Sequence, residues 1–206
     1  REQYATLTRR DRLLDVLAGL RAARVAGLHP IKINAVLLRG VNEDQAVPLL
    51  RWSLRNGYQL RFIEQMPLGP LHAWDRSAMV TAAEILGLLS AEFDLRPVPT
   101  PRGGAPAELW TVAGPGAATG EVGVIGAVSR PFCRACDRTR LTADGQLRTC
   151  LFAARETDLR AALRGGSDDA EVAEIWRDAT LSKPAGHGIG QRGFRQPHRL
   201  MSAIGG

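Results

Sequence analysis

The chain has 206 residues, of which 45% are hydrophobic and 23% are charged. This composition excludes wholesale disorder, and the length allows one domain or two modest ones. No run reaches the ~18–20 apolar residues that a membrane-spanning helix needs, and no secretory signal leads the chain, so we expect a cytoplasmic protein with no membrane partner.

The 27 Lys and Arg residues exceed the 21 Asp and Glu residues and give a formal net charge of +6. This thinly spread excess favours a small anionic ligand over a long nucleic-acid groove, although nucleic acid stays open. Almost all of the basic residues are arginine, since Lys32 and Lys183 are the only lysines. A single lysine at a given place in such an arginine-rich chain indicates a specific local role for that residue.

Up to residue 97 the hydrophobic pattern alternates between helices and strands. Thr8 and Asp11 resemble a capping box, and the apolar residues that follow at helical spacing predict a helix ending near Gly27. The next predicted elements are a strand over 31–38, a helix ending at Gly57, a strand over 60–66 and a helix beginning at Thr81. This order is typical of a parallel α/β sheet or barrel.

The two predicted strands carry polar residues where a buried parallel strand would be apolar. Because side chains alternate between faces, Lys32 and Asn34 share one face of the first strand. Arg61 and Gln65 repeat the pattern in the second strand. These residues indicate either the inside of a wide barrel that holds a charged ligand or an edge strand with a solvated face. The two strands alone do not separate these alternatives.

The pattern changes after residue 97, where a Pro- and Gly-rich segment over 99–104 predicts a linker. We therefore place a domain boundary near residue 97. The elements predicted beyond it are strands over 109–112 and 121–129, a hairpin over 140–151 that turns at Asp144-Gly145, and helices over 158–164 and 169–177.

Three cysteines lie within a short stretch of this second part. Cys133 and Cys136 form a C-x2-C pair, and the hairpin would return Cys150 toward them. Their odd number and close spacing argue against a disulfide framework and favour a metal site. The thiolates suit either zinc, with His187 or His198 as a fourth ligand, or a 4Fe-4S cluster with one iron left open to a small molecule.

Two arginines favour the iron–sulfur alternative. In an extended segment Cys136, Arg138 and Arg140 share one face, where guanidinium groups would repel a bare cation but could bind a phosphate beside a cluster. The other interpretation is a pair of solvated arginines on a hairpin. The terminal Gly205-Gly206 is either a frayed end or a slender tail that enters a tight cavity, and from the sequence alone the frayed end is favoured.

Several segments together carry a specific resemblance: residues 31–36, 61–67 and 132–141, Cys150, and residues 204–206. They are similar to the C-terminal portion of the GTP 3′,8-cyclase family, the lyase-type radical S-adenosylmethionine enzymes of molybdenum cofactor biosynthesis. The resemblance implies an α/β fold. Residues 1–97 would form the second half of an incomplete (β/α) barrel, and residues 98–206 an α+β extension that carries an iron–sulfur cluster and binds GTP.

The resemblance also implies roles for individual residues. The implied cluster ligands are Cys133, Cys136 and Cys150, whose 4Fe-4S cluster keeps one iron open for the GTP purine. The implied GTP-binding positions are Lys32, Arg138, Thr139 and Arg140. The implied S-adenosylmethionine contacts are Met66 and Arg61. The Gly205-Gly206 tail would assist catalysis in the active site.

One departure from the family is large, because this sequence has no C-x3-C-x2-C motif for the cluster that binds S-adenosylmethionine. That cofactor and a second 4Fe-4S cluster are expected only with an N-terminal half, and Arg1, which starts in mid-fold, suggests that this half is missing. We expect the chain alone to be inactive. The full enzyme would convert GTP to (8S)-3′,8-cyclo-7,8-dihydroguanosine 5′-triphosphate through a 5′-deoxyadenosyl radical and pass it to cyclic pyranopterin monophosphate synthase.

Three questions stay open at this point. The chain could instead be a zinc or iron–sulfur module that binds nucleic acid, although the resemblance disfavours it. It could also be a related radical enzyme with another substrate. Whether it forms a homodimer cannot be read from the sequence.

Overall fold

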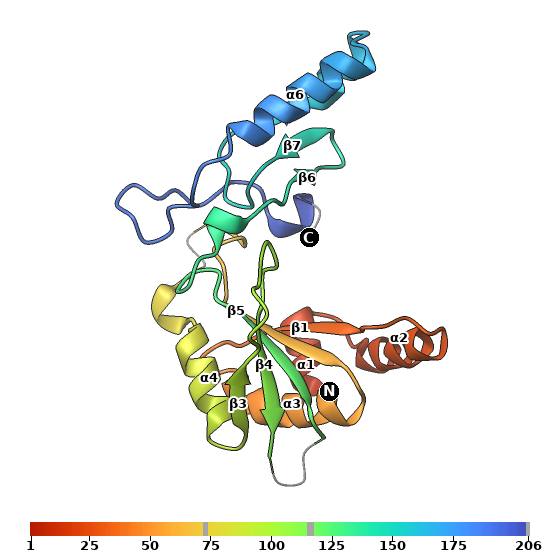
Figure 1. Cartoon of the computed structure of the whole chain (residues 1–206), viewed down its shortest axis with the longest axis vertical. Coiled ribbons are helices and arrows are strands. Elements are labelled where there is room, and N and C mark those ends of the chain that lie inside the picture. The colour runs from red at the N-terminus through yellow and green to blue at the C-terminus, as the bar shows by residue number, and fades with distance from the viewer. Residues whose placement is uncertain (72–73, 115–117, 205–206) are drawn as a thin grey trace.

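The structure, a computed structural model, describes residues 1–71, 74–114 and 118–204. Two lobes follow one another along its long axis (Figure 1). The N-terminal lobe contains a five-stranded sheet, and the C-terminal lobe contains a three-stranded sheet. No helix among the described residues is long and apolar enough to cross a membrane.

The strands of the larger sheet lie in the order β1 (Lys32–Val36), β2 (Gln59–Ile63), β5 (Gly120–Ile125), β4 (Glu108–Ala113) and β3 (Asp94–Pro97). β1, β2 and β5 run parallel, whereas β3 and β4 pair antiparallel with their neighbours. The predicted α/β class is therefore confirmed as a mixed sheet. The strands expected over 31–38 and 60–66 are present but shorter, and β3 was not predicted.

The larger sheet continues past residue 97. β5 pairs with β2 in parallel, and β4 joins β5 to β3, so both strands that follow residue 97 complete the same sheet. The edge of this sheet does not coincide with the expected division into residues 1–97 and 98–206, and that division stays a prediction.

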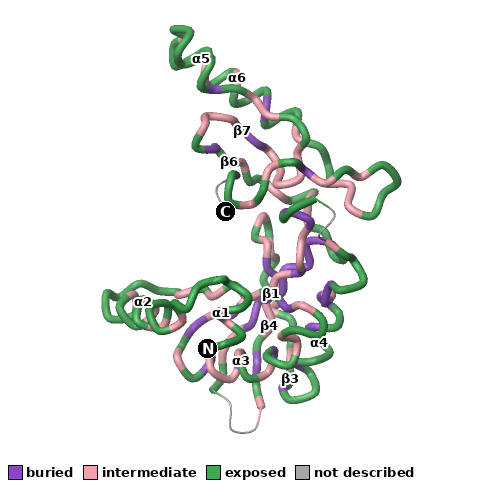
Figure 2. The backbone as a smooth tube through the Cα atoms, turned by 180° about the vertical axis from the view of Figure 1, so that it is seen from behind, coloured by how far each residue is buried: buried purple, intermediate pink, exposed green. Residues whose placement is uncertain are grey.

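Helices α3 (Ala46–Arg55) and α4 (Ala82–Ser90) bury one face of the larger sheet. Short 3₁₀ turns precede them, η1 (Glu43–Gln45) and η2 (Arg76–Ala78). The core is mostly aliphatic with two buried phenylalanines, Phe62 and Phe93, and its fully buried members include Leu50, Leu60, Phe62, Ile85, Leu89 and Val122. In Figure 2 the buried residues, in purple, lie along the strands of the sheet and on the helices that pack against it.

The other face of the sheet carries the polar residues that the sequence singled out. Lys32 and Asn34 are exposed on β1, which is an edge strand. On β2, Arg61 is half-buried, and its Nε donates a hydrogen bond to Asn34 Oδ1 at 2.9 Å. Among the described residues, β1 is the last strand on its side of the sheet, so the sheet is open there.

The first two helices differ from the prediction. The capping box expected at Thr8 is wrong, because Thr8 is the last residue of α1 (Glu2–Thr8), and its hydroxyl donates to the carbonyls of Tyr4 at 2.8 Å and Arg10 at 2.9 Å. α2 (Leu13–Val25) then begins without a side-chain cap. Neither helix buries a residue, and α2 projects beside β1 in Figure 1 and is mostly exposed in Figure 2.

The C-terminal lobe is built on the predicted hairpin. β6 (Arg140–Leu141), β7 (Gln146–Arg148) and β8 (Thr157–Asp158) form an antiparallel sheet in that order. The turn at Asp144-Gly145 is confirmed, with Gly145 at a φ of 79°, a conformation that glycine adopts readily.

Two helices cover this small sheet, α5 (Leu159–Arg164) and α6 (Asp169–Leu181). They bury a small core of Leu147, Leu159 and Ala179. Two 3₁₀ turns complete the described elements, η3 (Cys133–Ala135) and η4 (Met201–Ala203).

Candidate functional site

A cavity of about 320 Å³ lies between the carboxyl ends of β2 and β5 and the cysteine-bearing turns of the C-terminal lobe. Residues from both lobes line it: Met66, Ile125, Ala127, Phe132, Cys133, Cys136, Arg138, Thr139, Arg140, Arg148, Thr149, Cys150, Leu151, Phe152, Lys183, Pro184, Gly186 and His187. The three cysteines and the segment 138–140, which the sequence linked, therefore meet at one place.

The local fold explains how the three cysteines reach this cavity. Cys133 opens the turn η3, which closes when the Cys136 N–H donates to the Cys133 carbonyl at 3.1 Å. The hairpin of β6 and β7 then returns the chain, so that Cys150 follows β7 back to the same cavity. All three cysteines are half-buried, and none forms a disulfide.

All three cysteine side chains line the same cavity. Among the residues that the structure describes, no three His, Cys, Asp or Glu side chains are close enough to hold a single metal ion. A mononuclear tetrahedral zinc site needs every ligand atom within ~2.3 Å of one centre. In a 4Fe-4S cluster each thiolate binds a different iron, so its ligands stand apart. Three thiols at one cavity are the donor type that both kinds of metal centre use.

His187 lines the cavity, but both of its ring nitrogens are already engaged. Nδ1 accepts a hydrogen bond from the Ile189 N–H at 3.1 Å, and Nε2 lies 2.9 Å from the Ala127 carbonyl. The tautomer with the proton on Nε2 satisfies both contacts. Burial lowers the pKa of His187, and its ring lies 5.0 Å from that of Phe152. His187 is therefore a packed structural residue and a poor fourth ligand for zinc.

Two cations lie against the Cys136 sulfur. Arg138 Nε and Lys183 Nζ each donate to Sγ at 3.4 Å, and Lys183 also donates to the Arg138 carbonyl at 2.8 Å. Burial alone would raise the pKa of Cys136, but the backbone N–H and guanidinium of Arg138, together with Lys183, lower it overall. The lowered pKa favours the thiolate of Cys136, which is the form that binds metal.

Cys150 has a different environment. Burial raises its pKa, and the nearby Cys133 raises it further, while the Phe152 N–H, which donates to the Cys150 sulfur at 3.4 Å, acts in the opposite direction. The cavity therefore contains one thiol that favours ionisation and one that resists it. A bound cation would remove this difference, because metal ligation deprotonates a coordinating thiol.

Positive charge gathers on the wall next to the cysteines. Arg140 on β6 lies directly opposite Arg148 on β7, and the pKa of Arg140 is lowered by burial and by the charges of Arg138 and Arg148. Like charges that face each other across two strands are unfavourable by themselves. An anion in this cavity would offset that repulsion.

An aromatic ring supports the arginines of this wall. The guanidinium of Arg138 lies 4.9 Å from the ring centroid of Phe132, and that of Arg102 lies 5.0 Å from the same centroid. Both distances are within the range of a cation–π contact. Phe132 and Met66 both pack against the small core of Ala107, Ile125 and Ala127, so Phe132 links the arginine wall to the larger sheet.

Glu64 fixes the chain that leads into the cysteines. This fully buried carboxylate accepts hydrogen bonds from the backbone N–H groups of Ala82 at 2.6 Å, Val128 at 2.7 Å and Ser129 at 2.8 Å, and from the Ser129 hydroxyl. It therefore joins the end of β2 to the first turn of α4 and to the segment that runs from β5 toward Cys133.

The remaining predicted residues are divided. Met66 lines the cavity, whereas Lys32 and Arg61 lie on the polar face of the larger sheet and are not among the residues that line it. Gly205 and Gly206 lie outside the described residues. The residue before them, Ile204, is fully buried.

Sequence reasoning missed two cations of the cavity, Lys183 and Arg148. Lys183 had a signal, because it is one of only two lysines in the chain. Arg148 had a signal in its position, because it lies two residues before Cys150 on the returning strand, where it faces Arg140. Only the closing of the hairpin brings these residues to the cysteines.

A thiol-lined cavity with an arginine wall, placed at the carboxyl ends of parallel strands, has donor groups suited to a metal centre and to an anion. The chain belongs to the Molybdenum Cofactor Synthesis C family, whose profile matches residues 58–189. This finding confirms the family expected from the cysteine and arginine motif.

Curated relatives agree with this assignment. GTP 3′,8-cyclase of Mycolicibacterium smegmatis is 61% identical over 204 residues, which cover 98% of this chain and 56% of the relative. GTP 3′,8-cyclase 2 of Mycobacterium tuberculosis strain H37Rv is 58% identical over 207 residues, which cover 100% of this chain and 58% of the relative. The chain thus spans between 56% and 58% of the length of these two relatives.

Proposed function

We propose that this chain supplies the GTP-binding end of a GTP 3′,8-cyclase. The observation that carries the proposal is that three cysteines and four cations line one cavity. The names of the similar proteins support it, since both relatives are named as GTP 3′,8-cyclases. The rest of the active site would come from the barrel of the complete enzyme.

Cys133, Cys136 and Cys150 would hold a 4Fe-4S cluster in this proposal. When bound, such a cluster has one iron without a protein ligand, which supplies a coordination position for the purine of GTP. The protein places Arg138 and Lys183 beside Cys136, where their charges favour the thiolate. The half-buried cysteines would keep bulk water from the cluster.

The arginine wall would hold the triphosphate. Arg138, Thr139 and Arg140 line the cavity next to the cysteines, and guanidinium groups bind phosphate oxygens through paired N–H donors. Lys183 and Arg148 add two further cations that the sequence did not single out. This excess of positive charge over acidic groups suits a polyanionic substrate.

Residues outside the cavity complete the proposal. The polar face of β1 and β2, with Lys32 and Arg61, would line the inside of the barrel, where Lys32 binds GTP and Arg61, together with Met66, contacts S-adenosylmethionine. A second 4Fe-4S cluster would bind that cofactor on cysteines that this sequence does not contain. Gly205 and Gly206 would assist catalysis, and the product would pass to cyclic pyranopterin monophosphate synthase in the cytoplasm. A homodimer is compatible with this assignment.

Anaerobic reconstitution tests the cluster assignment. The protein, incubated with iron, sulfide and a thiol reductant, is expected to turn brown with broad absorbance near ~400 nm and to bind about four irons per chain in this cavity. Cys150→Ser should lose most of this colour, whereas an exposed change such as Arg134→Gln should not. A colourless protein with one tightly bound zinc would contradict the proposal and favour the zinc-module alternative.

A further inference from the structure

The last segment of the chain bridges the two lobes. We call residues 196–204 the C-terminal arm. The Gln196 side chain donates to the carbonyls of Gly69 at 2.9 Å and Pro70 at 3.2 Å, and the Met201 N–H donates to the Leu68 carbonyl at 3.1 Å. These contacts join the arm to the loop that follows β2, next to the cavity residue Met66.

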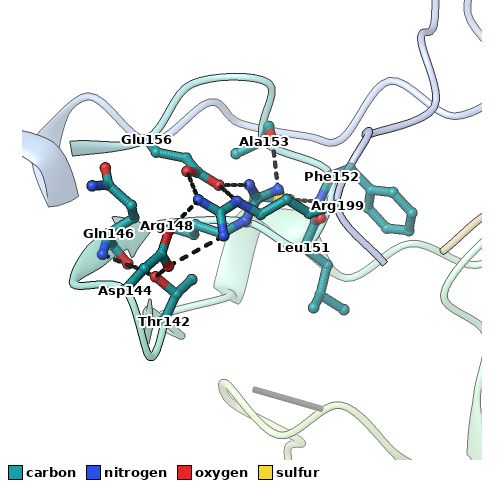
Figure 3. Close-up of polar contacts among 10 residues, drawn as sticks. Thr142, Asp144, Gln146, Arg148, Leu151, Phe152, Ala153, Glu156 and Arg199 are labelled. Carbon is teal, nitrogen blue, oxygen red and sulfur yellow. Dashed lines mark hydrogen bonds and ion pairs between the residues drawn. The ribbon is translucent and has the colours of Figure 1, made fainter. Parts of the chain in front are cut away.

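Arg199 joins the same arm to the hairpin on the other side. Its two terminal nitrogens donate to Asp144 at 3.2 Å and 2.8 Å, and Nη2 also donates to Glu156 Oε2 at 2.7 Å (Figure 3). The Thr142 hydroxyl donates to the same Asp144 carboxylate. Asp144 lies at the hairpin turn, so the planar guanidinium of Arg199 binds both the tip of the hairpin and the loop that carries Glu156.

The carboxylate of Glu156 is shared with a second arginine, Arg148. Arg148 is only 3% exposed, and its Nη1 donates to Glu156 while its Nη2 donates to the carbonyls of Ala153 at 2.6 Å and Leu151 at 3.2 Å. Figure 3 shows the guanidinium groups of Arg148 and Arg199 close together beside Glu156. Arg148 also lines the cavity, and its buried Nε has no hydrogen-bond partner among the described residues.

These ion pairs connect Arg199 in the arm, through Glu156, to Arg148 at the cavity wall. Removing one partner of a buried ion pair leaves the other without its counter-charge, so the two arginines depend on one another through Glu156. A loss of Arg199 would leave Glu156 paired with Arg148 alone, and this would change the orientation of the Arg148 side chain at the cavity. A simple surface ion pair would not have this consequence, since it would contact no residue of the site.

We propose that Arg199 is a positioning residue that clamps the C-terminal arm to the hairpin and, through Glu156, sets the orientation of Arg148 at the cavity wall. The clamp itself rests on the contacts alone. Its effect on ligand binding rests on the proposed function, because the ligand there is GTP.

Hydrogen exchange of the full-length gene product tests the clamp directly. In Arg199→Gln the amides of residues 196–204 are expected to exchange ~10-fold faster or more, because an ordered segment loses its anchor. Arg199→Lys keeps the positive charge but loses the planar guanidinium with its paired N–H donors. It should therefore restore part of the protection of the arm from exchange. Arg195→Gln is the matched control, because Arg195 is exposed on the same segment and no hydrogen bond or ion pair of its side chain is found in the described structure.

GTP binding to the reconstituted protein tests the coupling to Arg148. Arg199→Gln should weaken GTP binding ~3–10-fold without changing the absorbance of the cluster, and Arg195→Gln should leave it unchanged. If Arg199→Gln folds poorly, Asp144→Asn, which removes one carboxylate of the clamp, serves the same purpose and should also speed exchange in the arm.

The two experiments distinguish a failure of the clamp from a failure of the proposed function. Wild-type exchange rates in Arg199→Gln and Asp144→Asn would overturn the clamp. Faster exchange with unchanged GTP affinity would overturn the coupling to Arg148. A wild-type protein that binds no GTP would count against the proposed function, and the exchange rates would still decide the clamp.

Discussion

Arg140 and Arg148 face each other across the hairpin, and Arg138 and Lys183 lie beside Cys136 in the same cavity. Burial, and then the charges of Arg138 and Arg148, lower the pKa of Arg140. The free energy of this arrangement improves when an anion enters. At the scale of single residues, we therefore expect the cavity to favour a ligand that carries several negative charges.

The affinity for GTP should depend on these arginines. We expect Arg140→Ala to raise the dissociation constant of GTP ~10-fold or more, since a charge-assisted hydrogen bond contributes about 1.5–3 kcal/mol. Arg134→Ala is the control, because Arg134 is an exposed neighbour that does not line the cavity. Isothermal titration calorimetry on the reconstituted protein measures both. Equal affinities would contradict the assignment of the arginine wall.

At the scale of elements, the N-terminus of α4 shows how sequence and structure agree locally. The helix start expected at Thr81 is confirmed, and a capping box forms there: the Glu84 N–H donates to the Thr81 hydroxyl, and the Thr81 N–H donates to the Glu84 carboxylate at 2.8 Å. Hydrogen bonds from the Thr81 backbone and hydroxyl, and then from Arg39, lower the pKa of Glu84 to about 2. This carboxylate therefore stabilises the fold in its ionised form.

The stability of the protein should accordingly depend on pH through Glu84. Because its pKa is lowered on folding, the contribution is fully present above pH 4.5 and is lost as the pH falls toward 2. We expect Glu84→Gln to lower the free energy of unfolding by about 1 kcal/mol at pH 7 and by much less near pH 2.5, with the half-exposed Arg39 pair adding little. Urea denaturation at both pH values measures this difference. An equal loss at the two pH values would contradict the prediction.

Glu64 is a second element-scale connection, between β2, α4 and the segment that enters the cysteine turn. In Glu64→Gln the amide nitrogen cannot accept a hydrogen bond and would face the N–H groups of Val128 and Ser129. We expect a loss of ~2 kcal/mol in the free energy of unfolding and a lower iron content after reconstitution. Glu174→Gln changes an exposed carboxylate on α6 and should have no effect. Wild-type iron content and stability in Glu64→Gln would contradict this role.

Local signals in the sequence predicted much of this. Periodicity located α3, α4, β1 and β2, the Asp144-Gly145 turn located the hairpin, and the cysteine spacing located the cavity. Contacts between distant segments could not be predicted in the same way. β3 is short and polar and forms only because β4 lies beside it, and Arg148 and Lys183 become site residues only when the hairpin and the segment after α6 close over the cysteines.

At the scale of the whole molecule, the two lobes meet at the cavity, and the larger sheet stays open along β1. The polar face of β1 and β2 is exposed there, and α1 and α2 bury no residue. These surfaces fit the remaining part of a longer enzyme, as the coverage of the relatives also suggests.

The chain alone should therefore not begin the reaction. All three cysteines line one cavity, which leaves none to hold a second cluster for S-adenosylmethionine. We expect the reconstituted and reduced chain to release no 5′-deoxyadenosine from S-adenosylmethionine in the presence of GTP, as measured by chromatography. The full-length gene product is the positive control. Turnover by the chain above the protein-free blank would contradict the prediction.

The burial of Ile204 at the end of the C-terminal arm has a practical consequence for handling this protein. An affinity tag or fluorescent protein fused after residue 206 would begin two residues from a fully buried side chain, beside the junction of the two lobes. The same tag placed before α1 would meet only exposed and half-buried residues. Purification and labelling schemes should therefore avoid a fusion directly after residue 206.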